Sequence, residues 1–156
     1  MQMYLHYLQE FISSSDLASL LIAFILTLPI GWEREKETRS AGMRTFPLVA
    51  LASCGYILIG QSVAGDNPEA LAKILYGLMT GIGFIGGGAI LKENGSVHGT
   101  ATAASIWNTG AVGAAVAFER YEIAIVLAIV NFGTLRFVPI LKKKVIPEAK
   151  NNKFDQ

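Results

Sequence analysis

Residues 45–65 read TFPLVALASCGYILIGQSVAG and contain no Asp, Glu, Lys or Arg. A helix rises ~1.5 Å per residue, so ~20 residues are enough to cross the ~30 Å hydrocarbon layer of a bilayer. The stretch is continuously apolar and does not alternate between polar and apolar residues, which favours a membrane-spanning helix over a strand of a membrane barrel. We therefore predict that this segment crosses a membrane.

The rest of the chain repeats this pattern. Uncharged runs occupy residues 17–32, 74–91 and 94–118, and a run at 123–141 is interrupted only by Arg136. The composition agrees, because 52% of the 156 residues are apolar and 16% are charged, against about 25% charged residues in a soluble domain. We predict an all-α membrane protein, a bundle of five transmembrane helices in residues 17–141. The expected helices are 17–32, 46–64, 72–91, 100–118 and 122–141.

Basic residues cluster in alternate connections of this predicted bundle. One side of the membrane carries most of them, and the other side carries only Lys73 and Arg120. Because basic residues are retained in the cytoplasm, we predict an N-terminus outside and a cytoplasmic C-terminus. Residues 142–156 are then a basic cytoplasmic tail. Residues 1–16, which are rich in aromatic side chains, are predicted to form a short helix in the outer interface, and a frayed start of the chain is the alternative. The basic residues of the crowded side are Arg34, Lys36, Arg39, Arg44, Lys92, Lys142, Lys143, Lys144, Lys150 and Lys153.

Few residues offer catalytic or metal-binding chemistry. Cys54 is the single cysteine, and His6 and His98 are far apart in the sequence, so the chain has neither an internal disulfide nor a recognised zinc motif. The sequence also lacks the motifs of serine hydrolases and of phosphate-binding loops. We expect that the protein is not an enzyme and that it has no metal or cofactor site. A net charge of +1 provides no general attraction to nucleic acid.

Glycines dominate the third predicted helix. GIGFIGGG, residues 81–88, has the spacing of a dinucleotide-binding fingerprint, but no acidic residue follows ~20 positions later, as a true fingerprint requires. In an apolar helix, small residues at such spacing let two backbones approach closely. The sequence therefore favours close helix packing through Gly81, Gly83, Gly86 and Gly88, and a glycine-broken site that exposes backbone carbonyls is the alternative.

The fourth predicted helix is rich in small and polar residues. Thr102, Ser105 and Thr109 fall at helical spacing, and Asn108 adjoins them. These side chains are poor neighbours for lipid, so they either make hydrogen bonds between helices, which we favour, or line a cavity or translocation path. Trp107 is expected to brace the packing among its small neighbours.

Charged residues border the first two predicted helices. In GWEREKETRSAGMRT, residues 31–45, Glu33, Arg34 and Arg44 lie at the membrane edge, where a charge is retained if it is hydrated or paired. One hypothesis is an ion-pair clamp between these two helices, formed by Glu33 with Arg44 or by Arg34 with an acid. The alternative is a solvated charged loop. Arg136 is predicted to extend to the interface, and a buried partner for it remains open.

These motifs occur together in a known family. GWERE (31–35), AGMRT (41–45), GIGFIGGGAIL (81–91) and VHGTATAASIW (97–107) resemble, in this order, the blocks of the MgtC/SapB family of bacterial inner-membrane proteins. The resemblance covers about residues 17 to 136 and implies a multi-pass protein of the bacterial inner (plasma) membrane. It carries over as functional candidates Glu33, Arg34, Gly42, Arg44, Thr45, Gly81, Gly83, Phe84, Gly86, Gly88, Gly99, Thr102, Ala103, Ala104 and Trp107.

The resemblance also implies a biological setting. The family is associated with growth at low magnesium and, in pathogens, with survival inside host cells, and some members are thought to restrain the membrane ATP synthase. Many members have a soluble C-terminal domain, whereas this sequence ends at Gln156, soon after the last predicted helix. A regulatory role that resides in that domain is therefore not expected to transfer.

Two functions from different classes remain. The first is a regulatory or interaction protein of the inner membrane, linked to magnesium limitation or stress adaptation, that docks its small-residue faces as a homo-oligomer or against a complex such as the ATP synthase. The second is an ion transporter or channel, with Mg²⁺ as the candidate ion. Mg²⁺ is usually held through carboxylates and retained waters, and no predicted span has Asp or Glu in its apolar stretch, so we favour the first.

Overall fold

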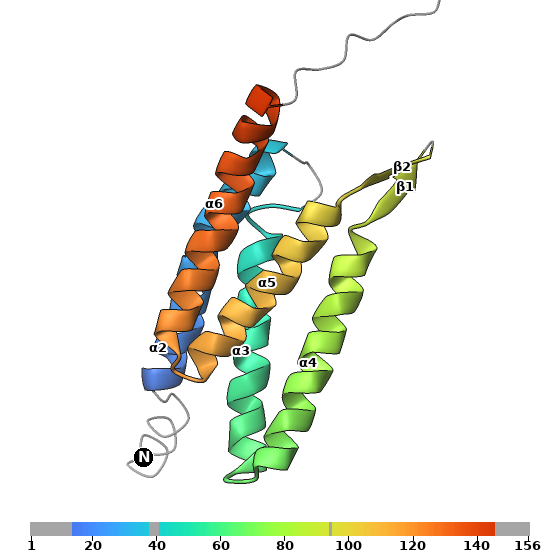
Figure 1. The fold of residues 1–156 in the computed structure, drawn as a ribbon. Coiled ribbons are helices and arrows are strands. Elements are labelled where there is room, and N and C mark those ends of the chain that lie inside the picture. The colour runs from blue at the N-terminus through green and yellow to red at the C-terminus, as the bar shows by residue number, and fades with distance from the viewer. Residues whose placement is uncertain (1–13, 38–40, 94, 146–156) are drawn as a thin grey trace, which may run out of the picture.

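The computed structural model describes residues 14–37, 41–93 and 95–145. Within these ranges the chain forms five helices and one two-stranded antiparallel hairpin (Figure 1). The elements are α2 (Ser14–Glu37), α3 (Thr45–Ala64), α4 (Pro68–Gly88), β1 (Leu91–Glu93), β2 (Ser96–His98), α5 (Thr100–Ala117) and α6 (Tyr121–Val145). The predicted interfacial segment lies almost entirely outside the described residues, and so does the predicted tail from residue 146 onward.

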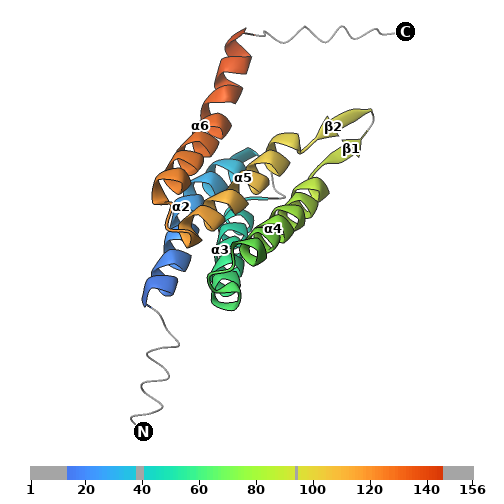
Figure 2. The same ribbon diagram turned by 60° about the horizontal axis from the view of Figure 1, so that its bottom comes forward.

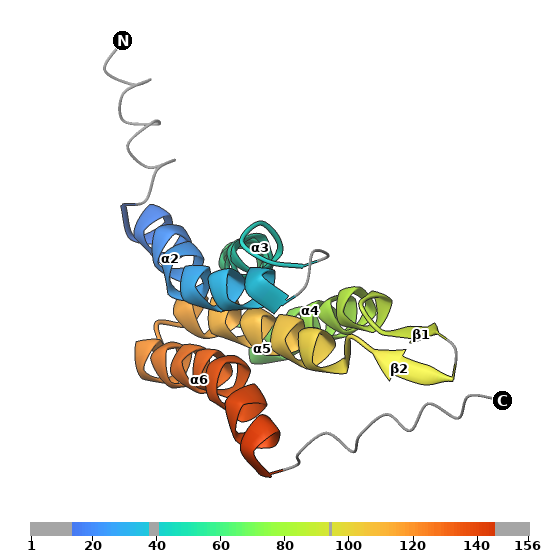
Figure 3. The ribbon, with the colours of Figure 1, turned by 90° about the horizontal axis from the view of Figure 1, so that it is seen from above.

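Four of the helices are long and apolar enough to cross a membrane, namely α2, α3, α4 and α6. α5 is not among them, and its position in the bundle explains its different composition. It contacts each of the other four helices and lies in their midst when the bundle is viewed from above (Figure 3). A helix that is surrounded by other helices has little contact with lipid, so it can carry Thr, Ser and Asn on faces that an outer helix would expose to lipid.

Small residues let the neighbouring helices approach α5 closely. Gly113 is buried against α3, and a Cβ atom added to it would overlap the carbonyl oxygen of Ala50. Gly110 lies under the side chain of Ile82 from α4 in the same way. Around these contacts the largest fully buried side chains, Phe46, Ile30, Ile57, Ile106 and Val112, form the core.

Several of the observed helix boundaries differ from the predicted ones, and for α4 a helix cap explains the difference. α4 begins at Pro68 instead of residue 72, because Asn67 Oδ1 accepts hydrogen bonds from the backbone N–H groups of Glu69 (3.1 Å) and Ala70 (3.2 Å). Pro68 occupies the first turn, where its missing N–H costs nothing. α2 and α6 continue a few residues past their predicted ends, into charged sequence.

The hairpin between α4 and α5 was not predicted, and the third predicted helix is wrong at its end, because Leu91 belongs to β1. Leu91 pairs with His98, and the hairpin projects from the end of the bundle (Figure 2). Its two-residue connection is Asn-Gly in the sequence, the pair that hairpin turns prefer because it tolerates positive φ, and Gly95 has φ +80°.

Charged residues are sorted to the two ends of the bundle. Consecutive helices run in opposite directions (Figure 1), so one end collects the C-terminal ends of α2, α4 and α6, the N-terminal ends of α3 and α5, and the hairpin. We call this the basic end, because its basic residues outnumber its acidic ones. It carries Arg34, Lys36, Arg44, Lys92, Arg136, Lys142, Lys143 and Lys144 together with Glu33, Glu35, Glu37 and Glu93. The opposite end carries Asp16, Asp66, Glu69, Lys73, Glu119, Arg120 and Glu122.

Candidate functional site

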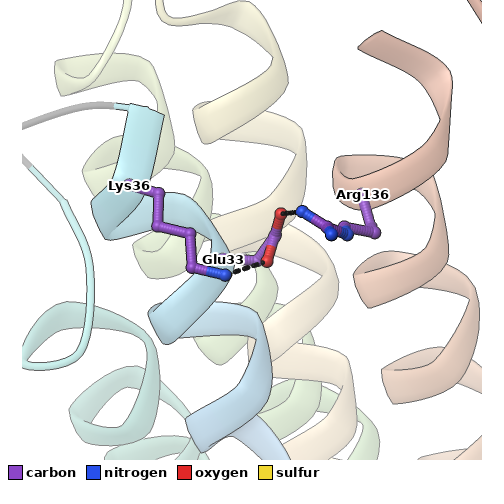
Figure 4. Close-up of polar contacts among 3 residues, drawn as sticks. All are labelled: Glu33, Lys36 and Arg136. Carbon is purple, nitrogen blue, oxygen red and sulfur yellow. Dashed lines mark hydrogen bonds and ion pairs between the residues drawn. The ribbon is translucent and has the colours of Figure 1, made fainter. Parts of the chain in front are cut away.

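Glu33 is a buried carboxylate at the basic end that joins α2 to α6. Only 6% of the residue is exposed, and both of its carboxylate oxygens are bonded. Arg136 Nη1, on α6, donates to Oε1 at 3.1 Å, and Lys36 Nζ, one turn further along α2, donates to Oε2 at 2.8 Å (Figure 4). The two cations compensate a charge whose burial without a partner would be costly.

This ion pair corrects the predicted clamp between the first two helices. Glu33 pairs with Arg136 and Lys36, and Arg44 forms no ion pair with any described residue. The clamp formed by Glu33 therefore closes between α2 and α6, which lie side by side, and does not reach Arg44 at the start of α3. The other form of the hypothesis, Arg34 with an acid, stays a prediction. The pair also answers the open question about Arg136, whose partner is Glu33.

Arg34 points to a different helix from its neighbour Glu33. Its Nε and Nη2 atoms both donate to Thr102 Oγ1, at 2.9 and 2.6 Å, and both residues are buried. Successive residues of a helix point ~100° apart, since a turn takes 3.6 residues, so Glu33 reaches α6 while Arg34 reaches α5. The C-terminal part of α2 is thus tied to two helices by two adjacent side chains.

A polar cluster continues from Thr102 into the bundle along α5. Ser105 Oγ donates to Asn131 Oδ1 at 2.7 Å, and Asn131 Nδ2 donates to Asn108 Oδ1 at 3.2 Å. Thr109 Oγ1 donates to the carbonyl oxygen of Ser105 in its own helix. The favoured interpretation of this face, hydrogen bonding between helices, holds for Ser105 and Asn108. Every buried side-chain nitrogen and oxygen in the described ranges has a hydrogen-bond partner.

The first two sequence blocks pack against each other beside this cluster. Glu35 Oε2 accepts a hydrogen bond from the backbone N–H of Met43 at 2.7 Å. A Cβ atom on Gly42 would lie 2.6 Å from that same Oε2, and a Cβ atom on Gly31 would lie 3.0 Å from the carbonyl oxygen of Gly42. A side chain on Gly42 would therefore force Glu35 to move, and one on Gly31 would be tightly packed against the start of α3.

The glycine block of α4 divides into inward and outward positions. Gly86 is buried, and a Cβ atom there would lie 3.1 Å from the carbonyl oxygen of Ala103 in α5. Gly81, Gly83 and Gly88 have no atom within 4 Å of such a position. Among the described residues, only Gly86 of the four predicted glycines makes the expected close contact.

Arg44, Thr45 and Trp107 lie away from the polar cluster. Arg44 is exposed and Thr45 is half-buried, and both line a groove of about 740 Å³ between α3 and α4. Trp107 is 50% exposed and borders a smaller cavity of about 210 Å³ between α4 and α5. Trp107 therefore lies at the surface of α5 beside this cavity, and its role in bracing the packing stays a prediction.

One residue of this region, Asn131, escaped the sequence analysis, whereas Gly99 was among the residues that the family resemblance carried over. Asn131 links α6 to α5, and its signal was a lone amide inside an apolar run, where polar side chains usually have a structural or functional partner. Gly99 has φ +84°, and a Cβ atom there would overlap the carbonyl oxygen of Ala89. Its conformation and its crowded position both require glycine at the turn into α5.

The four sequence blocks thus meet at one end of the bundle. Arg34 contacts Thr102, Glu35 contacts Met43, and Gly86 contacts Ala103, which joins each block to another. The described residues contain no group of three or more His, Cys, Asp and Glu side chains placed to hold a metal ion. Paired charges and hydrogen bonds join α2, α5 and α6 to one another and join α2 to the segment that precedes α3.

The fold and this cluster define a helical membrane protein with four candidate spans packed around a central polar helix. The sequence model of the MgtC family matches residues 20–144. The chain belongs to the MgtC family, which confirms the resemblance of the sequence blocks.

Individual relatives agree with this assignment. Protein SrpB of Synechococcus elongatus is 35% identical over 69% of this chain and 65% of its own length. Protein MgtC of Brucella abortus is 40% identical over 62% of this chain and 40% of its own length, and protein MgtC of Salmonella typhimurium is 34% identical over 72% and 47%. The matched region thus spans 40 to 65% of the length of these relatives. No solved structure matches the chain significantly.

Proposed function

We propose that the protein is an MgtC-like regulator of the bacterial inner membrane, linked to adaptation to low magnesium, that acts by docking α4 against a second membrane protein. The observation that carries this proposal is the open outer face of α4. In the apolar stretch of α4 only 11% of the residues are buried, against 39% in that of α3. Gly83 and Gly87 share this face, with no atom within 4 Å of an added Cβ.

The chemistry of this face suits association within a bilayer. Lipid tails are as apolar as leucine, so membrane helices associate through close packing, and small residues at i and i+4 permit the closest approach. Gly83 and Gly87 have this spacing. The occupants we propose are a second copy of the chain, which would make a homo-oligomer, and a complex such as the membrane ATP synthase.

A leucine placed on this face tests the proposal. Gly83→Leu is expected to reduce the oligomer mass measured by light scattering in detergent, and to abolish complementation of a deletion strain in low-magnesium medium. Thr134→Leu is the control, because Thr134 is exposed on α6 and lies outside both α4 and the α3–α4 groove. An unchanged mass together with normal growth for Gly83→Leu would reject the docking role.

The partner can be identified separately by crosslinking. A cysteine at Gly83 in a background that lacks Cys54 is expected to crosslink to a second copy or to a subunit of the ATP synthase in isolated membranes. A single cysteine placed instead at Thr134, which is exposed on α6, serves as the control. Equal crosslinking from both positions would show nonspecific contact and would argue against a specific face.

The proposal includes the predicted topology, in which α5 is the fifth crossing. Its 18 residues extend ~27 Å at 1.5 Å per residue, which is close to the thickness of the hydrocarbon layer. Five crossings place the basic end in the cytoplasm and the N-terminus outside. Reporter fusions inserted after Gly95 and after Asp66 are expected to report the cytoplasm and the exterior, respectively, and the reverse result would overturn this topology.

A second candidate function is ion transport, which one observation favours. Thr102, Ser105, Asn108 and Asn131 form a polar cluster inside the bundle, and polar groups at membrane depth often mark an ion path. Liposomes that contain the purified protein would then take up Mg²⁺ in proportion to the protein content. Asn131→Leu would abolish this flux, whereas Gly83→Leu would leave it unchanged. Absence of flux for a panel of ions would leave regulation as the function.

A further inference from the structure

The groove between α3 and α4 is apolar along most of its length. It has a volume of about 740 Å³, within the range of ~300–1,000 Å³ that is typical of small-molecule sites. The two helices meet near the turn that joins them, where a Cβ atom on Gly60 would lie 2.9 Å from Ile74 Cγ2, and they diverge toward the basic end (Figure 1). The apolar lining comes mainly from Leu48, Val49, Ala52, Ile74, Ile82 and Ile85.

The glycines of α4 give this groove its width. Gly77 and Gly81 line it, and neither has an atom within 4 Å of an added Cβ. Leucines at these two positions would project into the space. The groove is therefore separate from the Gly83 and Gly87 face, which lies on the other side of the same helix.

Among the described residues that line the groove, one is cationic, and it stands at the open end. Arg44 precedes α3 at the basic end, is exposed, and lines the groove together with Thr45. It forms no ion pair with any of the described residues, in contrast to Arg136 and Lys36, which share Glu33. A guanidinium group can bind two oxygens of a phosphate at once, and Thr45 adds a hydroxyl group beside it.

This arrangement of a cation above an apolar channel matches the chemistry of a phospholipid. An outer groove of a membrane helix pair is in contact with lipid, and the negative headgroups of the cytoplasmic leaflet attract basic residues at the membrane edge. A second copy of α4 in the groove would satisfy the apolar lining but would leave Arg44 without a counter-charge. The charge therefore distinguishes between these two occupants.

We propose that the α3–α4 groove binds one anionic phospholipid, with an acyl chain along the apolar lining and the phosphate on Arg44 and Thr45. The site is independent of the docking face on α4, and it requires only that the basic end lies at a membrane surface.

Lipid retention by the purified protein tests the proposal. The protein is mixed in detergent with equal amounts of phosphatidylglycerol and phosphatidylcholine of the same chain length, and the retained lipid is measured by native mass spectrometry. Wild-type protein is expected to retain one phosphatidylglycerol in preference to phosphatidylcholine. Arg44→Gln should reduce that preference roughly tenfold, in line with the loss of a charge-assisted hydrogen bond, and Arg44→Lys should preserve part of it.

Two substitutions that fill the groove test the acyl-chain part. Gly81→Leu from α4 and Ala52→Leu from α3 should each reduce retention of both lipids, whatever the headgroup. Circular dichroism and a monodisperse elution profile establish that each variant is folded. If Gly81→Leu does not fold, the test rests on Ala52→Leu.

Matched controls separate this site from general surface charge and from docking. Lys92→Gln removes a positive charge at the same end but outside the groove, and it should retain phosphatidylglycerol as the wild type does. Gly83→Leu should do the same even if it alters the oligomer. If Arg44→Gln and both groove-filling variants retain phosphatidylglycerol as the wild type does, the proposal is overturned. A change in oligomer mass with Gly81→Leu and Ala52→Leu, without loss of lipid, would identify a second copy as the occupant instead.

Discussion

α4 and α5 are both rich in glycine and other small residues, yet apart from Gly86 of α4 the structure uses their glycines in opposite ways. In α5, Gly110 and Gly113 are buried, and their neighbours occupy the space that a side chain would need. In α4, Gly77 and Gly83 have nothing within 4 Å of an added Cβ. A small residue in a membrane helix thus permits another helix to approach closely. Whether a helix of the same chain fills that space depends on the position of the small residue's helix in the bundle.

The strongest test of this comparison is a leucine at an inward glycine. Gly113→Leu places a side chain on the carbonyl oxygen of Ala50 and should separate α5 from α3, with a loss of at least ~3 kcal/mol in the free energy of unfolding. Unfolding in mixed micelles followed by circular dichroism measures this loss. Gly77→Leu is the matched outward change, and a comparable loss of stability there would contradict the distinction between the two helices.

The buried ion pair provides the second test, because it joins α2 to α6 beside the central helix. Glu33→Ala leaves Arg136 and Lys36 without their carboxylate, and we expect a loss of ~1–2 kcal/mol. This is below the 3–5 kcal/mol typical of a broken buried pair, because both cations are about half exposed. A double-mutant cycle with Arg136→Ala measures the coupling. Additive effects of the two substitutions would show that the contact contributes nothing to stability.

A third and smaller effect concerns the polar contact between α5 and α6. Asn131→Leu removes its hydrogen bonds to Ser105 and Asn108, and hydrogen bonds between membrane helices contribute ~0.6 kcal/mol on average. We expect a loss of ~1 kcal/mol in the same unfolding assay. Thr109→Val is the control, since Thr109 bonds only within α5 in the described structure, and a larger effect there than at Asn131 would argue against an interhelical role.

The smallest expected change in stability is at the outer face of α4. Gly83→Leu should alter the free energy of unfolding of the isolated chain by no more than ~0.5 kcal/mol, because surface changes away from packed groups are usually of this size. Its effect should fall on the oligomer mass instead. A monomer that unfolds much more easily than the wild type would show that this face is packed within the chain, and the comparison of α4 with α5 would then fail.

Much of the site could be predicted from single residues, but their partners could not. The spacing of Thr102, Ser105 and Asn108 predicted hydrogen bonds between helices, and Ser105 and Asn108 do contact Asn131 on α6. Glu33 was expected to need a partner at the membrane edge, but the predicted Arg44 was wrong. A charge in a membrane requires compensation wherever it lies, whereas the identity of the compensating residue depends on which helices are neighbours.

The hairpin differs from the polar contacts, because its sequence signal was local and the prediction overlooked it. The Asn-Gly pair at residues 94–95 is a strong turn signal, yet the uncharged run up to Leu91 was assigned to a helix. Apolar continuity indicates that a segment avoids water, but it does not by itself distinguish the end of a helix from a short strand.

By itself, the sequence determined the apolar segments, the accumulation of basic residues on alternate connections and the motifs of the MgtC family, because hydrophobicity and charge are properties of each residue that require no partner. Only the tertiary structure decided that α5 is the central helix, that Glu33 meets Arg136 across 103 positions of sequence, and that Gly86 faces inward while Gly83 faces outward. These facts depend on which helices pack side by side, and that choice results from the simultaneous fit of all five.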